Sequence, residues 1–128
     1  MRKESQNWWR QALADLEAAK DNLTMGHYFV SAFLCQQAAE KALKVVFMET
    51  LRERPPHTHS LIEVGRRLSA PSPIQSALRR LTPAYVITRY PDAATGIPAE
   101  LYDEGMARTH LDDAEEVFRW AKECLGLT

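Results

Sequence analysis

The chain has 128 residues, with 16 basic and 17 acidic side chains, so its net charge is close to zero. This length is typical of one domain with its own hydrophobic core, and we treat residues 1–128 as a single domain. The charge balance argues against a protein that binds nucleic acid or membranes through its overall charge. No apolar run reaches the ~18–20 residues of a membrane span, and no signal-peptide pattern is present. The sequence predicts a soluble, cytoplasmic protein.

The first predicted element is an amphipathic helix over residues 5–24. Its apolar residues recur at spacings of three and four, with charged residues on the other face. Ser5 is predicted to cap its start and Gly26 to end it, which leaves a tight connection to the next helix. Trp8 and Trp9 point about 100° apart on a helix, so only one can face the core. The other is a candidate contact with a partner.

The second predicted element, residues 26–51, is the central helix. Its apolar residues form two stripes, and a surface helix needs only one, so we expect packing on several sides. Its polar residues are predicted to form a narrow solvent-exposed strip: Gln36, Gln37, Glu40, Lys41 and Lys44. Glu40 precedes Lys44 by four residues, the spacing of a helical ion pair. Cys35 and Cys124 lie within helical patterns and are predicted to be buried free thiols. The alternative is a disulfide between them, which depends on their separation in space.

The rest of the chain is predicted to be helical with one long loop. Pro55-Pro56 end the central helix, and His59-Ser60 open a short helix. Ser72-Pro73 resembles a cap followed by a first-turn proline. Residues 86–101 have no helical period and are predicted to be an ordered loop of the kind that often carries function.

The last helix is predicted to start near Tyr102-Asp103 and to end at Gly126. No strand pattern, repeat or low-complexity segment is present in the sequence. The expected fold class is therefore all-α, an antiparallel bundle of four or five helices.

Three segments together resemble the HEPN domain family: ALADLEAAKDNL, FLCQQAAEKALKVVF followed by HTHSL, and TRYPDA before the last helix. The resemblance extends from Trp8 to Cys124. It implies an antiparallel bundle that forms a homodimer and binds a nucleotide or a partner protein. In many members of the family that partner is a minimal nucleotidyltransferase, in a toxin–antitoxin type pair. Other members are metal-independent endoribonucleases.

The ribonuclease branch has an Arg, four to six residues and then a His near the start of the last helix. An imidazole can move the ribose 2′-hydroxyl proton while a guanidinium holds the phosphate. This spacing is not found at the expected position, because Arg108 is only two residues before His110 and no His follows Arg89 at that distance. It does occur in the loop after the central helix, for example at Arg52–His57 and Arg54–His59. Whether the protein is an enzyme therefore stays open, with these candidate catalytic residues: Arg89, Arg108, His110 and His59.

The candidate ligand-binding residues lie mainly in the loop before the last helix. Arg89 would contact a phosphate, Tyr90 would stack on a base and Asp92 would orient the arginine. The alternative is structural, an Arg89–Asp92 pair and a proline turn that lock the loop onto the bundle. Further candidates for the same role are Tyr102, Lys41 and Lys44. Tyr102 is either the residue that begins the last helix or a pocket wall.

Two other groups of residues have alternative interpretations. Six basic residues form either a groove for nucleotide or RNA or ordinary solvated faces: Lys41, Lys44, Arg66, Arg67, Arg79 and Arg80. His57 and His59 lack carboxylate or cysteine neighbours, so no metal site is predicted and a helix cap is favoured. The only small-molecule ligand that we expect is a nucleotide.

The favoured interpretation is an HEPN-like nucleotide- or partner-binding protein that acts with a minimal nucleotidyltransferase. One alternative is a metal-independent endoribonuclease toxin. Another is a structural dimer without a ligand, held together through Trp8 or Trp9.

Overall fold

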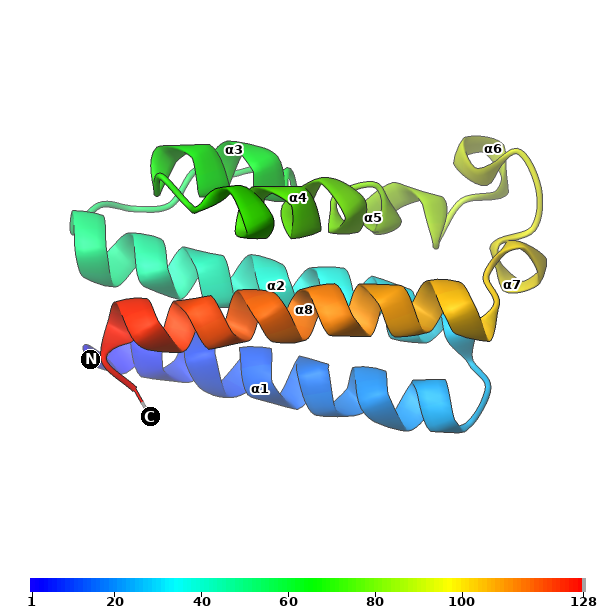
Figure 1. Cartoon of the computed structure of the whole chain (residues 1–128), viewed down its shortest axis with the longest axis horizontal. Helices are drawn as coiled ribbons and strands as arrows, with labels where there is room; N and C mark the ends of the chain where they lie inside the picture. The colour runs from blue at the N-terminus through cyan, green and yellow to red at the C-terminus, as the bar shows by residue number, and fades with distance from the viewer. Residues whose placement is uncertain (128) are drawn as a thin grey trace.

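The computed structural model describes residues 1–127, and every regular element in this range is a helix (Figure 1). The helices are α1 (Lys3–Thr24), α2 (Tyr28–Leu51), α3 (Leu61–Arg67), α4 (Ser72–Leu81), α5 (Ala84–Ile87), α6 (Pro91–Ala94), α7 (Pro98–Leu101) and α8 (Glu104–Leu125). Helices α1 and α4 run in one direction, and α2 and α8 run in the other (Figure 1). The predicted all-α antiparallel bundle is therefore confirmed.

The layers are visible in Figure 1, where α1 covers one side of the α2–α8 pair and α3, α4 and α5 cover the other. The short helices α6 and α7 lie at the end of the bundle where α8 begins. No helix between residues 1 and 127 is both long and apolar enough to cross a bilayer.

Helix α2 is the centre of the core, and it is buried on more sides than the sequence predicted. Both apolar stripes are buried over most of their length, as expected. The predicted exposed strip is wrong, because Gln36, Glu40 and Lys44 are all buried. The physical reason is that α3, α5 and the segment between α2 and α3 cover this side of the helix. The predicted Glu40–Lys44 ion pair does form, at 3.2 Å, but inside the protein.

Helix α1 begins two residues earlier than predicted. Ser5 is not its cap, because the Ser5 side chain is buried and donates a hydrogen bond to Glu49 Oε2 at 2.7 Å. Gly26 has φ +84° and ends the helix as expected, since glycine adopts this left-handed conformation without a steric cost. Trp9 faces the core with its ring centroid 5.4 Å from that of Phe118, whereas Trp8 is half-buried.

Helices α3 and α4 pack closely against each other. Ser60 caps α3 as predicted, because its side chain accepts a hydrogen bond from the Glu63 amide. Ser72 does not cap α4; it lies in the first turn, and Pro71 precedes the helix. Gly65 is buried, and a Cβ atom there would lie 2.3 Å from Cδ1 of the buried Leu78. A glycine therefore allows this close approach.

The segment 86–101 is not the loop that the sequence predicted. It contains the end of α5 and the whole of α6 and α7, each four residues long. Both α6 and α7 begin with a proline, which favours the first helical position. A single turn is too short to show a helical period, which explains why the pattern was missed.

The last helix agrees with the prediction. Asp103 caps α8 by accepting a hydrogen bond from the Met106 amide at 2.8 Å, and Gly126, with φ +70°, ends it. Cys35 is buried as expected, but Cys124 is exposed because it lies on the outer face of α8. Both thiols are free.

Candidate functional site

The most distinctive surface feature is a stack of three side chains centred on Tyr85 in α5. The His59 ring lies parallel to the Tyr85 ring, with the centroids 3.7 Å apart and the planes inclined by 13°. The guanidinium carbon of Arg89 lies 4.0 Å from the Tyr85 centroid. One face of a phenol ring has room for only one planar group at this distance, so His59 and Arg89 occupy opposite faces. The structure thus brings together two of the four candidate catalytic residues.

His59 is held by a buried carboxylate. Its Nδ1 lies 3.0 Å from Glu40 Oε1, and the Glu40 side chain is only 8% exposed while that of His59 is 52% exposed. Carboxylate oxygens accept hydrogen bonds, so this contact places the proton of a neutral imidazole on Nδ1. The Nε2 atom has no partner in residues 1–127 and keeps its lone pair toward solvent. The exposed nitrogen is therefore able to accept a proton or a hydrogen bond.

A buried polar network supports this carboxylate. Glu40 also accepts hydrogen bonds from Gln36 Nε2 at 3.1 Å and from Lys44 Nζ at 3.2 Å. The Gln36 amide is 3.3 Å from the backbone oxygen of His59 as well. A buried carboxylate needs several donors to offset its lost hydration. The network fixes the orientations of Glu40 and His59.

Arg89 is held in place by aromatic rings and one carbonyl group. Its Nε donates to the backbone oxygen of Tyr85 at 2.7 Å. Its guanidinium carbon lies 5.0 Å from the Tyr90 centroid and 5.4 Å from the Phe33 centroid, distances at which a cation and a ring attract each other. Arg89 is nevertheless exposed, so its terminal nitrogens face solvent.

The predicted Arg89–Asp92 pair is not formed. Arg89 turns back onto Tyr85, and Asp92 lies in the first turn of α6, where it is exposed and makes no ion pair with any described residue. Tyr90 immediately precedes α6 and is 52% exposed, next to Arg89. Of the three predicted loop residues, Arg89 and Tyr90 therefore belong to the candidate site and Asp92 does not.

The other predicted ligand residues lie elsewhere. Lys41 Nζ is 2.7 Å from Asp15 Oδ2, and Lys44 is paired with Glu40, so neither is a free cation. Tyr102 is buried at the start of α8, with its ring 6.1 Å from that of His110, and burial raises its pKa.

The alternative catalytic pair in α8 is not formed. Arg108 is exposed and lies 4.0 Å from Glu104, one turn away. His110 is half-buried and lines a pocket with Arg79 and Arg80 of α4 instead. Burial lowers the pKa of His110 below its ordinary value.

The six basic residues do not converge into one groove. Arg67 pairs with Glu53 at 3.4 Å, and Arg80 pairs with Asp113 at 2.8 Å. Lys41 lines a hollow beside Trp8, whereas Arg79 and Arg80 lie between α4 and α8. His57 lines another hollow with Trp8 and so does not join His59. In the part of the chain that the structure describes, no three His, Cys, Asp or Glu side chains form a possible metal-ligand set.

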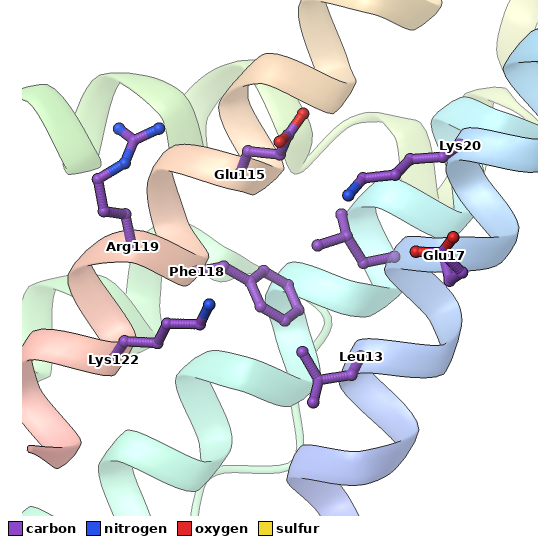
Figure 2. Close-up of a pocket in the computed structure, with 8 residues that line it drawn as sticks. Leu13, Glu17, Lys20, Glu115, Phe118, Arg119 and Lys122 are labelled. Atoms are coloured by element: carbon purple, nitrogen blue, oxygen red, sulfur yellow. The ribbon is translucent and has the colours of Figure 1, made fainter. Parts of the chain in front are cut away.

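A separate groove of about 360 Å³ runs between α1 and α8. Figure 2 shows the Phe118 ring and Leu13 lying between the two helices, with charged side chains around them. These are Glu17 and Lys20 from α1 and Glu115, Arg119 and Lys122 from α8. Both signs of charge are present and no imidazole or aromatic platform is exposed there. The groove therefore lacks the chemistry of the Tyr85 stack.

Sequence reasoning missed two central residues of the candidate site. Tyr85 was not selected, and Glu40 was expected to be exposed. The only local signal for Tyr85 is that an aromatic residue stands two positions after Pro83. This signal does not reveal that His59 and Arg89 contact the two faces of its ring. A contact between segments far apart in the chain has no spacing that a single sequence would show.

Fold and site define a small antiparallel helical-bundle domain that presents a histidine–tyrosine–arginine stack to solvent. The family model of the HEPN domain matches residues 5–124. No curated protein matches the sequence significantly. The chain therefore belongs to the HEPN domain family, as the resemblance implied.

Three solved structures are similar to this one. TT1696 from Thermus thermophilus has a TM-score of 0.85 at 30% identity, with 96% of this chain and 99% of that chain covered. ST0689, an archaeal HEPN homologue, has a TM-score of 0.82 at 31% identity, with coverage of 96% and 98%. TM0613, an HEPN domain protein from Thermotoga maritima, has a TM-score of 0.75 at 27% identity, with coverage of 94% and 98%.

Proposed function

We propose that this HEPN domain protein binds the phosphate groups of a nucleotide at the His59–Tyr85–Arg89 stack. The observation that carries the proposal is the position of Arg89. Three aromatic rings and the Tyr85 carbonyl hold its guanidinium group, while its terminal nitrogens face solvent. Guanidinium groups bind phosphate through paired hydrogen bonds.

Preorganisation makes this arginine a better anion ligand than an ordinary surface arginine. A free arginine side chain loses rotamer entropy when it binds, at a cost of about 0.5–1.5 kcal/mol. In Arg89 the Nε hydrogen bond and the stacking on Tyr85 have already fixed the side chain. The exposed ring of Tyr90 lies beside it and offers a surface on which a base can stack.

We further propose that the protein works as a homodimer with a minimal nucleotidyltransferase, because the family resemblance implies both partners. The half-buried Trp8, with a hollow on either side, is a suitable contact for one of them. Independent migration of the two proteins in a mixture at micromolar concentration would contradict the second partner.

The test of nucleotide binding is calorimetric titration of ATP and AMP into the wild type and Arg89→Gln. We expect the variant to bind at least about tenfold more weakly, because a charge-assisted contact to phosphate is lost. Arg66→Gln is the matched control, since Arg66 is exposed and forms no ion pair in residues 1–127. Equal affinity of Arg89→Gln and the wild type would reject the site.

A metal-independent endoribonuclease is the second candidate, and the Glu40–His59 hydrogen bond favours it. His59 Nε2 would take the 2′-hydroxyl proton as the 2′-oxygen attacks phosphorus. The bond from phosphorus to the 5′-oxygen would break, and that oxygen would take a proton from solvent. The products are a 2′,3′-cyclic phosphate and a 5′-hydroxyl, with Arg89 stabilising the charge on the reacting phosphate.

Incubation of a mixed RNA pool with excess chelator distinguishes the two candidates. Cleavage that disappears in His59→Ala and persists in His110→Ala supports the ribonuclease. Nucleotide binding without cleavage by the folded protein supports binding alone.

A further inference from the structure

We propose a second ligand site, between α4 and the first turns of α8, that binds a small organic anion through His110, Arg79 and Arg80. The ligand class is a molecule with phosphate or carboxylate oxygens beside an apolar group. This site is distinct from the Tyr85 stack and does not depend on the function proposed for it.

The site is a pocket of about 300 Å³. Its lining combines two guanidinium groups, one imidazole and mainly apolar surface: Arg79, Arg80, His110, Thr109, Pro83 and Met106. Met106 is 41% exposed, so it gives the pocket an apolar surface that a ligand can reach. An apolar wall next to cations is suited to a ligand that has both kinds of surface.

His110 supplies the decisive observation. Its Nδ1 is buried without a hydrogen-bond partner, and it is the one such side-chain atom in residues 1–127. Its Nε2 forms no hydrogen bond within the same residues and is not buried, so it is accessible from outside. Among backbone groups a buried unpaired N–H is rarer than a buried unpaired acceptor, and we apply the same preference to the imidazole ring. The proton of the neutral ring therefore resides on Nε2, which becomes a hydrogen-bond donor toward the pocket.

The neutral state of His110 follows from its surroundings. Burial lowers its pKa, nearby Arg80 lowers it further, and Asp113 acts in the opposite direction. Tyr102, between α7 and α8, has its ring centroid 6.1 Å from that of His110. It is uncharged at neutral pH, since burial raises its pKa. At pH 7 the ring therefore carries one proton.

Arg79 gives the pocket its positive charge, and Arg80 adds a hydrogen-bond donor. Arg80 donates from Nε and Nη2 to the two oxygens of Asp113, at 2.9 and 2.8 Å, so its Nη1 is left for a ligand. The Asp113 carboxylate and the Arg80 guanidinium offset each other's charge, so the net charge of the pocket comes from Arg79. Arg79 contacts only the Ser76 hydroxyl, at 3.2 Å, and is exposed. The polar groups that these three residues leave accessible at the pocket are donors.

The donors of Arg79, Arg80 and His110 favour an anion over a cation or a neutral base. Pro83 and Met106 then favour an anion with an apolar part over inorganic phosphate alone. The arrangement also excludes His110 as a general base at neutral pH, because its accessible nitrogen is already protonated.

The experiment uses the full chain labelled with ¹⁵N at histidine, titrated with phenyl phosphate and benzoate at pH 7. We expect the His110 signals to show the Nε2–H tautomer and to shift on binding. Arg79→Gln should weaken binding about tenfold without changing the melting temperature, because Arg79 is exposed. Arg66→Gln should leave the binding unchanged, because Arg66 is exposed and lines neither site.

Three results would overturn the proposal. The first is an Nδ1–H tautomer for His110. The second is unchanged affinity in Arg79→Gln. The third is equally tight binding of inorganic phosphate or of benzyl alcohol, since each lacks one half of the proposed ligand. His110→Phe keeps an aromatic ring without the donor, and calorimetric titration should show weaker binding of phenyl phosphate to this variant than to the wild type.

Discussion

Two histidines in this domain lie near an arginine, yet their surroundings give them opposite properties. Nδ1 of His59 faces the carboxylate of Glu40, whereas Nδ1 of His110 faces no partner. The exposed Nε2 is consequently an acceptor in His59 and a donor in His110. The comparison shows that the partner of Nδ1, and not the neighbouring arginine, determines whether Nε2 donates or accepts a hydrogen bond.

The two environments also differ in how they are supported. Behind His59 is a buried network in which Glu40 accepts hydrogen bonds from Gln36 and Lys44. Behind His110 is the buried Tyr102 ring, whose contact with it is apolar packing. Changes behind His59 should therefore cost more stability than changes around His110.

The largest expected effect is that of Glu40→Gln, which removes the carboxylate behind His59. The buried Lys44 ammonium loses its partner, and loss of one member of a buried ion pair costs about 3 kcal/mol. Urea unfolding should show this loss in the free energy of unfolding. Glu104→Gln, in an exposed pair, is the control and should cost less than about 0.5 kcal/mol. A similarly small loss of unfolding free energy in both variants would mean that the Lys44 ammonium reaches solvent when Glu40 is replaced.

An intermediate effect is expected for the pH dependence of stability, through His110. The pKa of His110 is lower in the folded protein than the ordinary 6.5. As the pH falls below 6.5, the unfolded chain takes up a proton that the folded chain does not, so stability decreases. The decrease ends once the pH is below the folded pKa, and its slope corresponds to at most one proton.

His110→Phe should remove this component of the pH dependence. The measurement compares the free energy of unfolding of the wild type and the variant from pH 7 to pH 5. The difference between the two should shrink or reverse in favour of the variant as the pH falls. A constant difference over this range would contradict the buried, neutral environment of His110.

The smallest effect is expected for Arg108→Ala. Arg108 and Glu104 form an exposed pair one turn apart, and such pairs contribute about 0.3–0.5 kcal/mol. Both ligand affinities and any cleavage of RNA should stay at the wild-type level, because Arg108 lines neither site. Loss of binding or cleavage in this variant would support Arg108 and His110 as a functional pair, the alternative that the sequence left open.

The sequence predicted the long helices well, because α1, α2 and α8 are long enough for the spacing of their apolar residues to be clear. It failed for α6 and α7, since one turn has no period. It also failed for the polar side of α2. Gln36, Glu40 and Lys44 follow the pattern of a solvent face, and the same pattern is produced by a buried hydrogen-bonded network.

The candidate site was less predictable than the fold. Arg89 and His59 were each selected from the sequence, but only as separate candidates. Their meeting on Tyr85 depends on how α5 and the segment before α3 pack on α2. The spacing between an arginine and a histidine along the chain carries no information about such a contact.

The filling of both faces of the Tyr85 ring has a consequence for selectivity. No nucleobase can slide against a ring that is already covered by His59 on one side and Arg89 on the other. A nucleotide at this site would be held by its phosphate groups and by stacking of its base on the exposed Tyr90 ring, and both contacts are open to adenine, guanine, cytosine and uracil nucleotides. The domain on its own should not discriminate between bases, and any preference for one base would have to come from a second macromolecule.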